Sequence, residues 1–517
     1  MEVQTPLPSA RAGRAEWLGL GVLMLAVLLV SMDVTILYFA APYVSADLEP
    51  TGTQQLWMLD VYGFVLAGLL ITMGSLADRT GRRRVLLLGA ALFGCASAAA
   101  SFAQTADQLI ACRAVMGIGG ATLMPSSLAL LRNLFVDDAQ RRKAVAIWTG
   151  VVSGGAALGP LLGGLLLEHF SWGSVFLVNA PVMVALVVAA PLLLPESKDP
   201  GAGRFDLASA ALSLAAILPF VYGLQRAAVD GLAALPVVAM AIGAAVGVAF
   251  VRRQRALEDP MIDLSLFRDV RFSGALSVNL MAMLGLVGFA LFTTQYLQSV
   301  LGYGPLEAAL LTLPAPLSVG FVAPLAMWAS TRVRPAAVVA AAFVLAATGY
   351  AILTQTDGLW VALIGTVITT MGLAGAMTLL TDLILAAAPP SRAGAASAVA
   401  ETGQELGGAL GVALLGSLGT AVYRGDLGSG VPRAAHDTLG GAVAIGDHAL
   451  LVAARTAFTH GLQVAALGAG VVMALAATVA WVTLRGVPAH AHAEAAAEAG
   501  AGAGEPQRPG LSAAHVA

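Results

Sequence analysis

Long apolar stretches separated by short polar segments dominate this chain between residues 17 and 485. A helix needs about 20 apolar residues to cross the roughly 30 Å of a bilayer's hydrocarbon core, and a window of that length predicts fourteen such helices. They are expected at residues 17–40, 54–77, 85–104, 107–131, 144–168, 172–194, 206–226, 231–251, 271–299, 307–329, 335–354, 360–386, 395–420 and 457–484. This pattern predicts an all-α polytopic membrane protein, with six helices, an inserted pair and six more helices.

The polar segments suggest how the chain is divided. We expect a cytoplasmic N-terminus, a first six-helix bundle, two inserted helices with cytoplasmic linkers, a second six-helix bundle and a disordered cytoplasmic tail. These parts correspond to residues 1–16, 17–194, 195–270, 271–485 and 486–517. The tail is predicted to be disordered because it lacks apolar periodicity. Within the second bundle, the polar, glycine-containing segment 421–456 predicts an external loop, which could form a lid or a hairpin.

Basic residues fix the expected orientation. If the N-terminus is cytoplasmic, 22 of the 27 Lys and Arg residues fall in cytoplasmic segments, four fall outside, and Arg113 lies within a helix. Cytoplasmic loops of membrane proteins carry an excess of Lys and Arg, so this distribution predicts an even number of spans with both termini inside.

Composition agrees with a membrane protein and excludes several other classes. Hydrophobic residues make up 58% of the chain and charged residues 11%, whereas soluble domains contain about 25% charged residues. The net charge of -3 gives no indication of a nucleic-acid partner. Cys95 and Cys112, the two cysteines, lie in apolar segments and predict neither a disulfide framework nor a metal site.

No motif for ATP hydrolysis or enzyme chemistry occurs in the chain. A phosphate-binding P-loop needs Lys followed by Ser or Thr, but the only lysines are Lys143, before Ala144, and Lys198, before Asp199. The H-E-x-x-H and G-x-S-x-G patterns are also missing. We therefore expect no enzyme activity and no cofactor, and a proton gradient as the energy source.

Ionisable residues inside the apolar stretches are the strongest functional signal. Asp33, Asp60, Glu401 and Glu405 all lie in predicted spans, where a charge costs about 2.5 to 3.5 kcal/mol and usually binds an ion, a proton or a cationic substrate. Glu401 and Glu405 are four residues apart and share a helix face, although a structural role for Glu405 stays open. Arg113 needs a carboxylate or carbonyl partner, either in a structural ion pair or in a proton relay.

The loop after the second predicted helix resembles the signature G-x-L-A-D-R-x-G-R-[RK] of the major facilitator superfamily. The matching residues are Gly74, Leu76, Ala77, Asp78, Arg79, Gly81, Arg82 and Arg83. The resemblance implies the two-bundle fold of that superfamily and a role for this loop as a conformational latch. Gly74 would permit close helix approach, and Asp78 would cap or pair with a neighbouring helix end.

Further motifs resemble those of the superfamily's fourteen-helix drug:proton antiporters. They are Asp33-Val34-Thr35 in the first helix, Trp57 to Tyr62 in the second, Arg113-x-x-x-Gly117 in the fourth, and a glycine-rich antiporter motif in the fifth. That motif contains Gly155, Gly159, Pro160, Gly163 and Gly164; ordinary helix packing is the alternative interpretation. The resemblance also favours Glu401 as the acid of quaternary-ammonium exporters, and the aromatic residues Tyr38, Trp57, Tyr62 and Trp148 as candidate substrate contacts.

These observations predict a proton-coupled multidrug antiporter that exports lipophilic, mainly cationic compounds. Its expected partners are such small molecules, protons and the lipid bilayer, and we expect a monomer in a bacterial cytoplasmic membrane. Two alternatives remain: an exporter of one antibiotic or metabolite, and a membrane sensor that does not transport.

Overall fold

The computed structural model describes residues 12–198, 206–230, 233–257, 260–387, 393–428 and 430–487. Most of the predicted N-terminal segment 1–16 and tail 486–517 lie outside these residues. Within the described ranges the chain forms helices and no strand, and fourteen helical segments are long and apolar enough to cross a membrane. The predicted all-α class and the predicted number of spans are confirmed.

The first part of the chain forms seven helices, two of which share one span. They are α1 (Arg14–Leu48), α2 (Gly52–Thr80), α3 (Arg82–Ala100), α4 (Ala106–Leu134), α5 (Asp138–His169), α6 (Ser174–Leu177) and α7 (Asn179–Leu193). The sixth predicted helix is divided into α6 and α7, because Pro181 has no N–H to donate to the carbonyl of Leu177.

The inserted pair consists of α8 (Leu207–Asp230) and α9 (Ala234–Ala256). The two helices are joined at their cytoplasmic ends, where Arg253 donates to Asp206 Oδ1 at 2.9 Å. Burial raises the pKa of Asp206, but hydrogen bonds from Ser209 and Arg253 outweigh it and hold this pKa below its usual value. α8 also contacts the first bundle, because Ser213 Oγ donates to the carbonyl of Gly68 at 3.1 Å.

The last part of the chain contains the remaining spans and two short external helices. Its elements are η1 (Leu266–Arg268), α10 (Val270–Gln295), η2 (Tyr296–Val300), α11 (Pro305–Thr312), α12 (Pro314–Arg332), α13 (Pro335–Leu353), α14 (Leu359–Ala387), α15 (Ala393–Leu427), α16 (Arg433–Asp437), α17 (Leu439–Ile445) and α18 (His448–Leu484). Pro314 divides the predicted helix 307–329 into α11 and α12.

The prediction of an external loop over 421–456 is wrong in extent. α15 continues to Leu427 and α18 begins at His448, so the membrane-spanning helices extend into this segment from both sides. Between them, α16 and α17 form a short helical pair. Capping residues explain the local structure: Thr438 accepts from the backbone of Gly441, and Asp447 from that of Leu450. Arg424 pairs with Asp437 and ties the helical pair to the end of α15.

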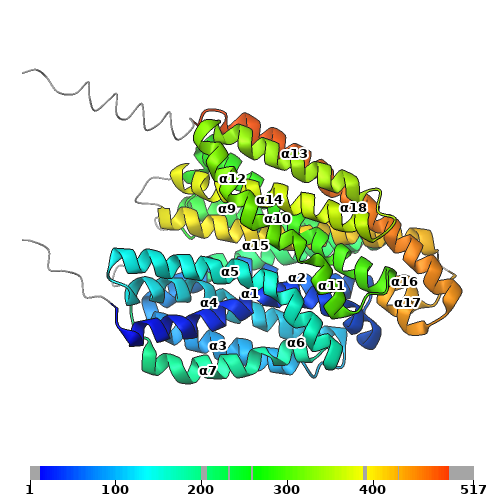
Figure 1. Ribbon diagram of the computed structural model, residues 1–517. Coiled ribbons are helices and arrows are strands. Elements are labelled where there is room, and N and C mark those ends of the chain that lie inside the picture. Colours follow the sequence, from blue (N-terminus) through cyan, green and yellow to red (C-terminus); the bar gives the residue numbers. More distant parts are fainter. Residues whose placement is uncertain are drawn as a thin grey trace, which may run out of the picture.

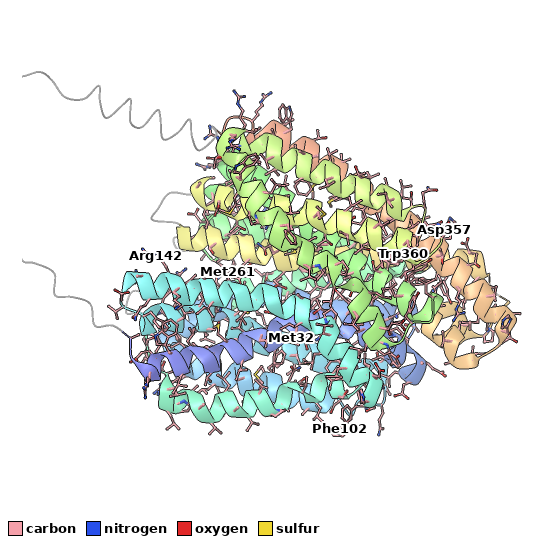
Figure 2. All side chains as sticks on the ribbon, viewed as in Figure 1. Met32, Phe102, Arg142, Met261, Asp357 and Trp360 are labelled. Atoms are coloured by element: carbon pink, nitrogen blue, oxygen red, sulfur yellow. The ribbon has the colours of Figure 1, made fainter. Side chains whose placement is uncertain are left out.

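The helices lie side by side, with α1 to α7 in one group and α10 to α18 in another (Figure 1). Arg142 lies at one end of the molecule, whereas Phe102, Asp357 and Trp360 lie at the other (Figure 2). Met32, the neighbour of Asp33, is midway between these ends (Figure 2). Asp33 therefore lies in the interior of α1, away from both ends of the molecule.

Candidate functional site

An ion pair between α1 and α4 forms the centre of the candidate site. Arg113 Nη1 contacts Asp33 Oδ2, and their side chains are 0% and 1% exposed. Arg113 Nε also donates to the carbonyl of Met58 at 3.2 Å, and its guanidinium lies 4.6 Å from the centroid of the Tyr62 ring. The expected carboxylate and carbonyl partners of Arg113 are thus both present, and Met58 and Tyr62 bring α2 into the same cluster.

Glycines next to Arg113 make this cluster possible. A Cβ at Gly117 would lie 2.8 Å from the carbonyl oxygen of Tyr62, and one at Gly120 would lie 2.8 Å from the Tyr62 hydroxyl. Only glycine lets α4 approach α2 so closely at these two positions. The R-x-x-x-G spacing therefore places the arginine one turn from a close contact between the two helices at Gly117.

Asp60 has a partner that the sequence did not reveal. Gln225 Nε2, on the inserted helix α8, donates to Asp60 Oδ2 at 2.9 Å, and both side chains are buried. One turn away, the rings of Trp57 and Tyr222 lie 6.3 Å apart. A buried amide in an apolar helix is the signal that would have identified Gln225, because such a group needs a hydrogen-bond partner.

The two acids of α15 lie at the boundary between the helix groups. Glu401 lines a cavity of about 240 Å³ together with Leu70, Ile71, Gly74, Ser75, Asp78, Pro125 and Ala398. Glu405 lies one turn further along α15, and Tyr38 is within electrostatic reach of Asp60, Arg113 and Glu405. The predicted acids therefore do not share one contact: Asp33 pairs with Arg113, Asp60 binds Gln225, and Glu401 faces the cavity.

The predicted aromatic contacts are spread over the same region. Tyr38 and Tyr62 are buried, and the Tyr62 ring is covered by Arg113 in this conformation. Trp148 donates from Nε1 to Ser127 Oγ at 3.1 Å, which joins α5 to α4.

The glycines of the antiporter motif have two different neighbours. Cβ atoms at Gly155, Gly159 and Gly163 would approach atoms of α1 to 2.8, 2.0 and 2.8 Å respectively. A Cβ at Gly164 would instead lie 2.8 Å from the backbone of Leu306 in α11. Three of these glycines thus form the groove in which α1 carries Asp33, and the fourth permits contact between the two helix groups. Pro160 lies within α5 between them.

The predicted latch is held within its own helix group in this conformation. Arg82 Nε donates to Asp78 Oδ1 at 2.7 Å, so Asp78, near the end of α2, pairs with the first residue of the neighbouring helix α3. Arg83 donates to the carbonyl of Leu194 at 2.8 Å, and Glu196 accepts from the backbone of Arg83 at 3.1 Å. Gly81, with φ +129°, makes the turn between α2 and α3.

Two other predicted latch residues have fewer contacts. Arg79 is exposed. A Cβ at Gly74 would meet Pro125 at an ordinary 3.5 Å, so this conformation does not require glycine there.

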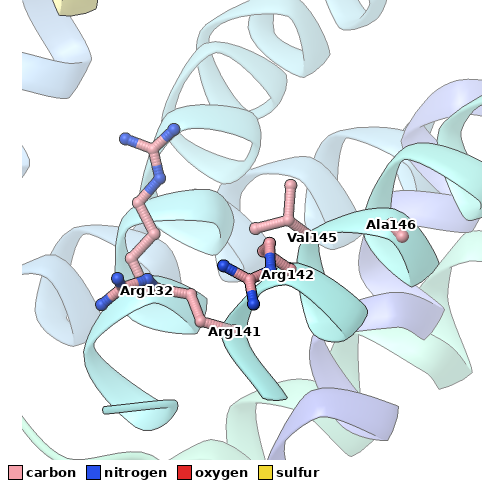
Figure 3. A pocket seen from close by; sticks show the side chains of 5 residues that line it. All are labelled: Arg132, Arg141, Arg142, Val145 and Ala146. Atoms are coloured by element: carbon pink, nitrogen blue, oxygen red, sulfur yellow. The ribbon is translucent and has the colours of Figure 1, made fainter. Parts of the chain in front are cut away.

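The cytoplasmic ends of α4 and α5 form a basic recess. Arg132, Arg141 and Arg142 line it with Val145 and Ala146, and its volume is about 600 Å³ (Figure 3). Arginines at this position agree with the predicted cytoplasmic side of the membrane.

The two ends of the molecule differ in how the helix groups meet. At the external end, Leu56 packs against Gly416, and the cavity between α2, α10, α15 and α17 is only about 40 Å³. Gly440 of α17 lies against Ser45 of α1. At the cytoplasmic end, α2, α4 and α15 border the cavity of about 240 Å³. The packing between the helix groups therefore leaves less space at the external end than at the cytoplasmic end.

Comparisons with known proteins agree with this architecture. Residues 23–412 match the sequence model of the Major Facilitator Superfamily. The multidrug efflux pump LfrA of Mycolicibacterium smegmatis is 43% identical over 93% of this chain and 98% of its own length. The methyl viologen resistance protein SmvA of Salmonella typhimurium is 36% identical over 91% of this chain and 98% of its own.

A solved structure shows the same fold. The inward-facing, unoccupied structure of a bacterial homologue of the human lysosomal transporter Spinster aligns with a TM-score of 0.66 over 92% of this chain and 98% of its own, at 17% identity. The fourteen spans and the bacterial relatives identify a multi-pass protein of the cytoplasmic membrane. The chain belongs to the major facilitator superfamily.

Proposed function

We propose that this protein exports lipophilic, mainly cationic small molecules across the cytoplasmic membrane in exchange for protons. The observation that carries this proposal is the position of Glu401, an acid on a largely apolar cavity at the cytoplasmic end of the molecule. Apolar walls suit a lipophilic body, and a carboxylate suits a positive charge. Relatives named as a multidrug efflux pump and a methyl viologen resistance protein support the same function; methyl viologen is an organic dication.

Transport follows an alternating-access cycle, in which the binding cavity opens in turn to the cytoplasm and to the outside. In the state described above, a substrate enters from the cytoplasm, while the contacts of Leu56 with Gly416 and of Gly440 with Ser45 close the external side. The two helix groups then rock about the centre of the membrane, which opens the outside and closes the inside. Gly164 lies at the external contact between the groups, so this contact must separate during each cycle.

Protons and the cationic substrate compete for the same carboxylates, and this competition couples proton entry to cation export. A charged acid in the membrane interior is unfavourable by about 2.5 to 3.5 kcal/mol, and either a proton or a bound cation removes this penalty. A proton that arrives from the outside displaces the exported cation, and its release inside restores the carboxylate. The proton gradient then drives export without a bound cofactor, and a monomer contains every group that this cycle uses.

A narrower function is the second candidate. Other relatives are named for single compounds, such as the puromycin resistance protein of Streptomyces alboniger, which is 33% identical over 91% of this chain and 91% of its own. Such an exporter would respond to one compound and ignore unrelated cations.

Proton release from proteoliposomes distinguishes these functions. We expect ethidium and tetraphenylphosphonium, added to purified protein in vesicles with a pH-sensitive dye, each to release protons from the wild type. Glu401→Gln should abolish this release, because the amide cannot exchange a proton for a cation.

Asp382→Asn is the matched control, since Asp382 is an exposed acid near the cytoplasmic end of α14. It should leave proton release unchanged. If folded wild-type protein releases no protons with either cation, multidrug export is excluded and the single-compound function is favoured.

A further inference from the structure

Asp60 and Gln225 form an incomplete hydrogen-bonded pair deep in the protein. Their side chains are 2% and 0% exposed, and one bond of 2.9 Å joins Gln225 Nε2 to Asp60 Oδ2. Among the residues that the structure describes, the other two oxygens, Asp60 Oδ1 and Gln225 Oε1, have no hydrogen-bond partner. Both unpaired atoms are acceptors, so the pair lacks a donor.

One proton supplies this missing donor. A carboxyl group that takes up a proton on one oxygen becomes a donor there and keeps an acceptor on the other, while a primary amide offers one acceptor and two donors. After a rotation of the two side chains, the protonated carboxyl donates to Gln225 Oε1 and accepts from Gln225 Nε2. No other covalent bond changes, and the proton leaves by the reverse step.

We propose that Gln225 completes a proton-holding site at Asp60, and that the inserted helix α8 is thereby part of the transport site. This proposal adds a proton site to the proposed function. It rests on the proposed function, because the bound proton is used in export only if the protein is a proton-coupled exporter. Under this proposal Gln225 is a positioning residue, because it acts through Asp60 and need not touch the substrate.

The packing of α8 keeps the pair in place. Phe64 of α2 and Val221 of α8 are buried in one apolar cluster with Ala409 and Ala413 of α15. Ser213 Oγ holds α8 to the carbonyl of Gly68 at 3.1 Å. Gln225 therefore projects toward Asp60 from a helix that contacts both α2 and α15.

The charged groups around Asp60 differ from those around Asp33. Arg113 gives Nη1 to Asp33 and Nε to the carbonyl of Met58, whereas Asp60 receives its hydrogen bond from a neutral amide. Tyr38 of α1 and Arg113 of α4 lie within electrostatic reach of Asp60. Glu405 of α15 is within reach of Tyr38, and Arg226, next to Gln225, lies 5.9 Å from the Tyr222 ring. An acid paired with a neutral amide can be protonated without leaving a cation unpaired.

Infrared difference spectroscopy tests the pair directly. We expect spectra of the full-length protein in proteoliposomes, recorded between high and low pH, to contain a protonated-carboxyl band that Asp60→Asn removes. In Gln225→Met this band should move to higher frequency, because the carbonyl of Asp60 loses the hydrogen bond from the amide. The pH at which half of the band appears should also shift.

Ser213→Ala is the matched control: it removes a hydrogen bond between α8 and α2 about three turns from Gln225, while the apolar cluster that includes Phe64 and Val221 still holds α8 beside Asp60. It should leave the band in place. If Gln225→Met does not fold, Gln225→Leu provides the same test. A band that is unchanged in the variant, or a wild type with no band assignable to Asp60, would overturn the proposal.

Failure of this proposal can be separated from failure of the proposed function. If cations release protons but the Asp60 band does not change in the Gln225 variant, the proposed Asp60–Gln225 pair is wrong and the proposed export function is unaffected. A band that depends on Gln225, in protein that releases no protons with any cation tested, supports the pair and overturns the proposed function.

Discussion

At the scale of single residues, the buried guanidinium of Arg113 organises the charged groups in the protein interior. Arg113 is fully buried and is held by Asp33, by a backbone carbonyl and by the face of Tyr62. Removal of one partner of a buried ion pair typically costs about 3 to 5 kcal/mol, whereas removal of both partners is often nearly neutral. Asp33 thus has a structural role in addition to any role in transport.

This pairing predicts that Asp33→Asn lowers the thermal unfolding temperature of the purified protein, because Arg113 is left without its counter-charge. The double variant Asp33→Asn/Arg113→Met should regain most of the lost stability. Neither variant should release protons when cations are added. Tryptophan fluorescence during heating measures stability, and a double variant less stable than Asp33→Asn alone would contradict the prediction.

At the scale of helices, small residues determine which surfaces meet. α5 has glycines at 150, 154, 155, 159, 163 and 164, but only the last four contact other helices. A Cβ at Gly150 or Gly154 would meet nothing within 4 Å. Gly155, Gly159 and Gly163 lie against the part of α1 that carries Asp33, so they position the acid as well as the helix.

A comparison of two alanine substitutions in α5 tests this difference. In Gly159→Ala the new Cβ would lie 2.0 Å from Thr35 Oγ1 and 3.1 Å from the carbonyl of Met32. Overpacking of this kind costs about 1 to 3 kcal/mol, and we expect lower thermal stability and slower export.

Gly150→Ala is the matched control. It should keep the wild-type unfolding temperature or raise it, since alanine favours a helix by about 1 kcal/mol over glycine. If Gly150→Ala lost as much thermal stability and export as Gly159→Ala, contact between α5 and α1 would not explain the effect of the Gly159 substitution.

At the scale of the whole molecule, the two helix groups leave less space between them at the external end than at the cytoplasmic end. α2 and α15 form much of their boundary, from Leu56 against Gly416 at the external end to Glu401 beside Gly74 at the cytoplasmic end. The inserted α8 packs on both of these helices. Movement of one group against the other must therefore change the environments of Asp60 and Glu401 together.

A cross-link between the groups should stop this movement. A Cβ at Gly63 would lie 3.4 Å from the Cβ of Ala409, close to the roughly 3.5 to 4.5 Å of a disulfide. We expect Gly63→Cys/Ala409→Cys, with Cys95 and Cys112 replaced by serine, to lose export on oxidation and to regain it on reduction. Each single-cysteine variant is the control, and export that continues in fully cross-linked protein would exclude rocking at this boundary.

Sequence patterns alone were sufficient for the number of spans, their orientation, the superfamily and the acids inside the membrane. The reason is that a membrane-spanning helix satisfies its own backbone hydrogen bonds, so length and apolarity identify it without any neighbour. Local motifs likewise identified Arg113 and the glycines of α5, because their residue types are unusual in such helices.

Only the tertiary structure decided which of these groups meet. Helices that are apolar on all sides carry no periodic signal for the face that contacts a neighbour. The pairs Asp33 with Arg113 and Asp60 with Gln225 join residues 80 and 165 positions apart. Thr438 caps the start of α17, and Arg424 pairs with Asp437 at the end of α16. Hydropathy reports how a segment partitions into the bilayer, whereas side-chain partners depend on how the helices pack within it.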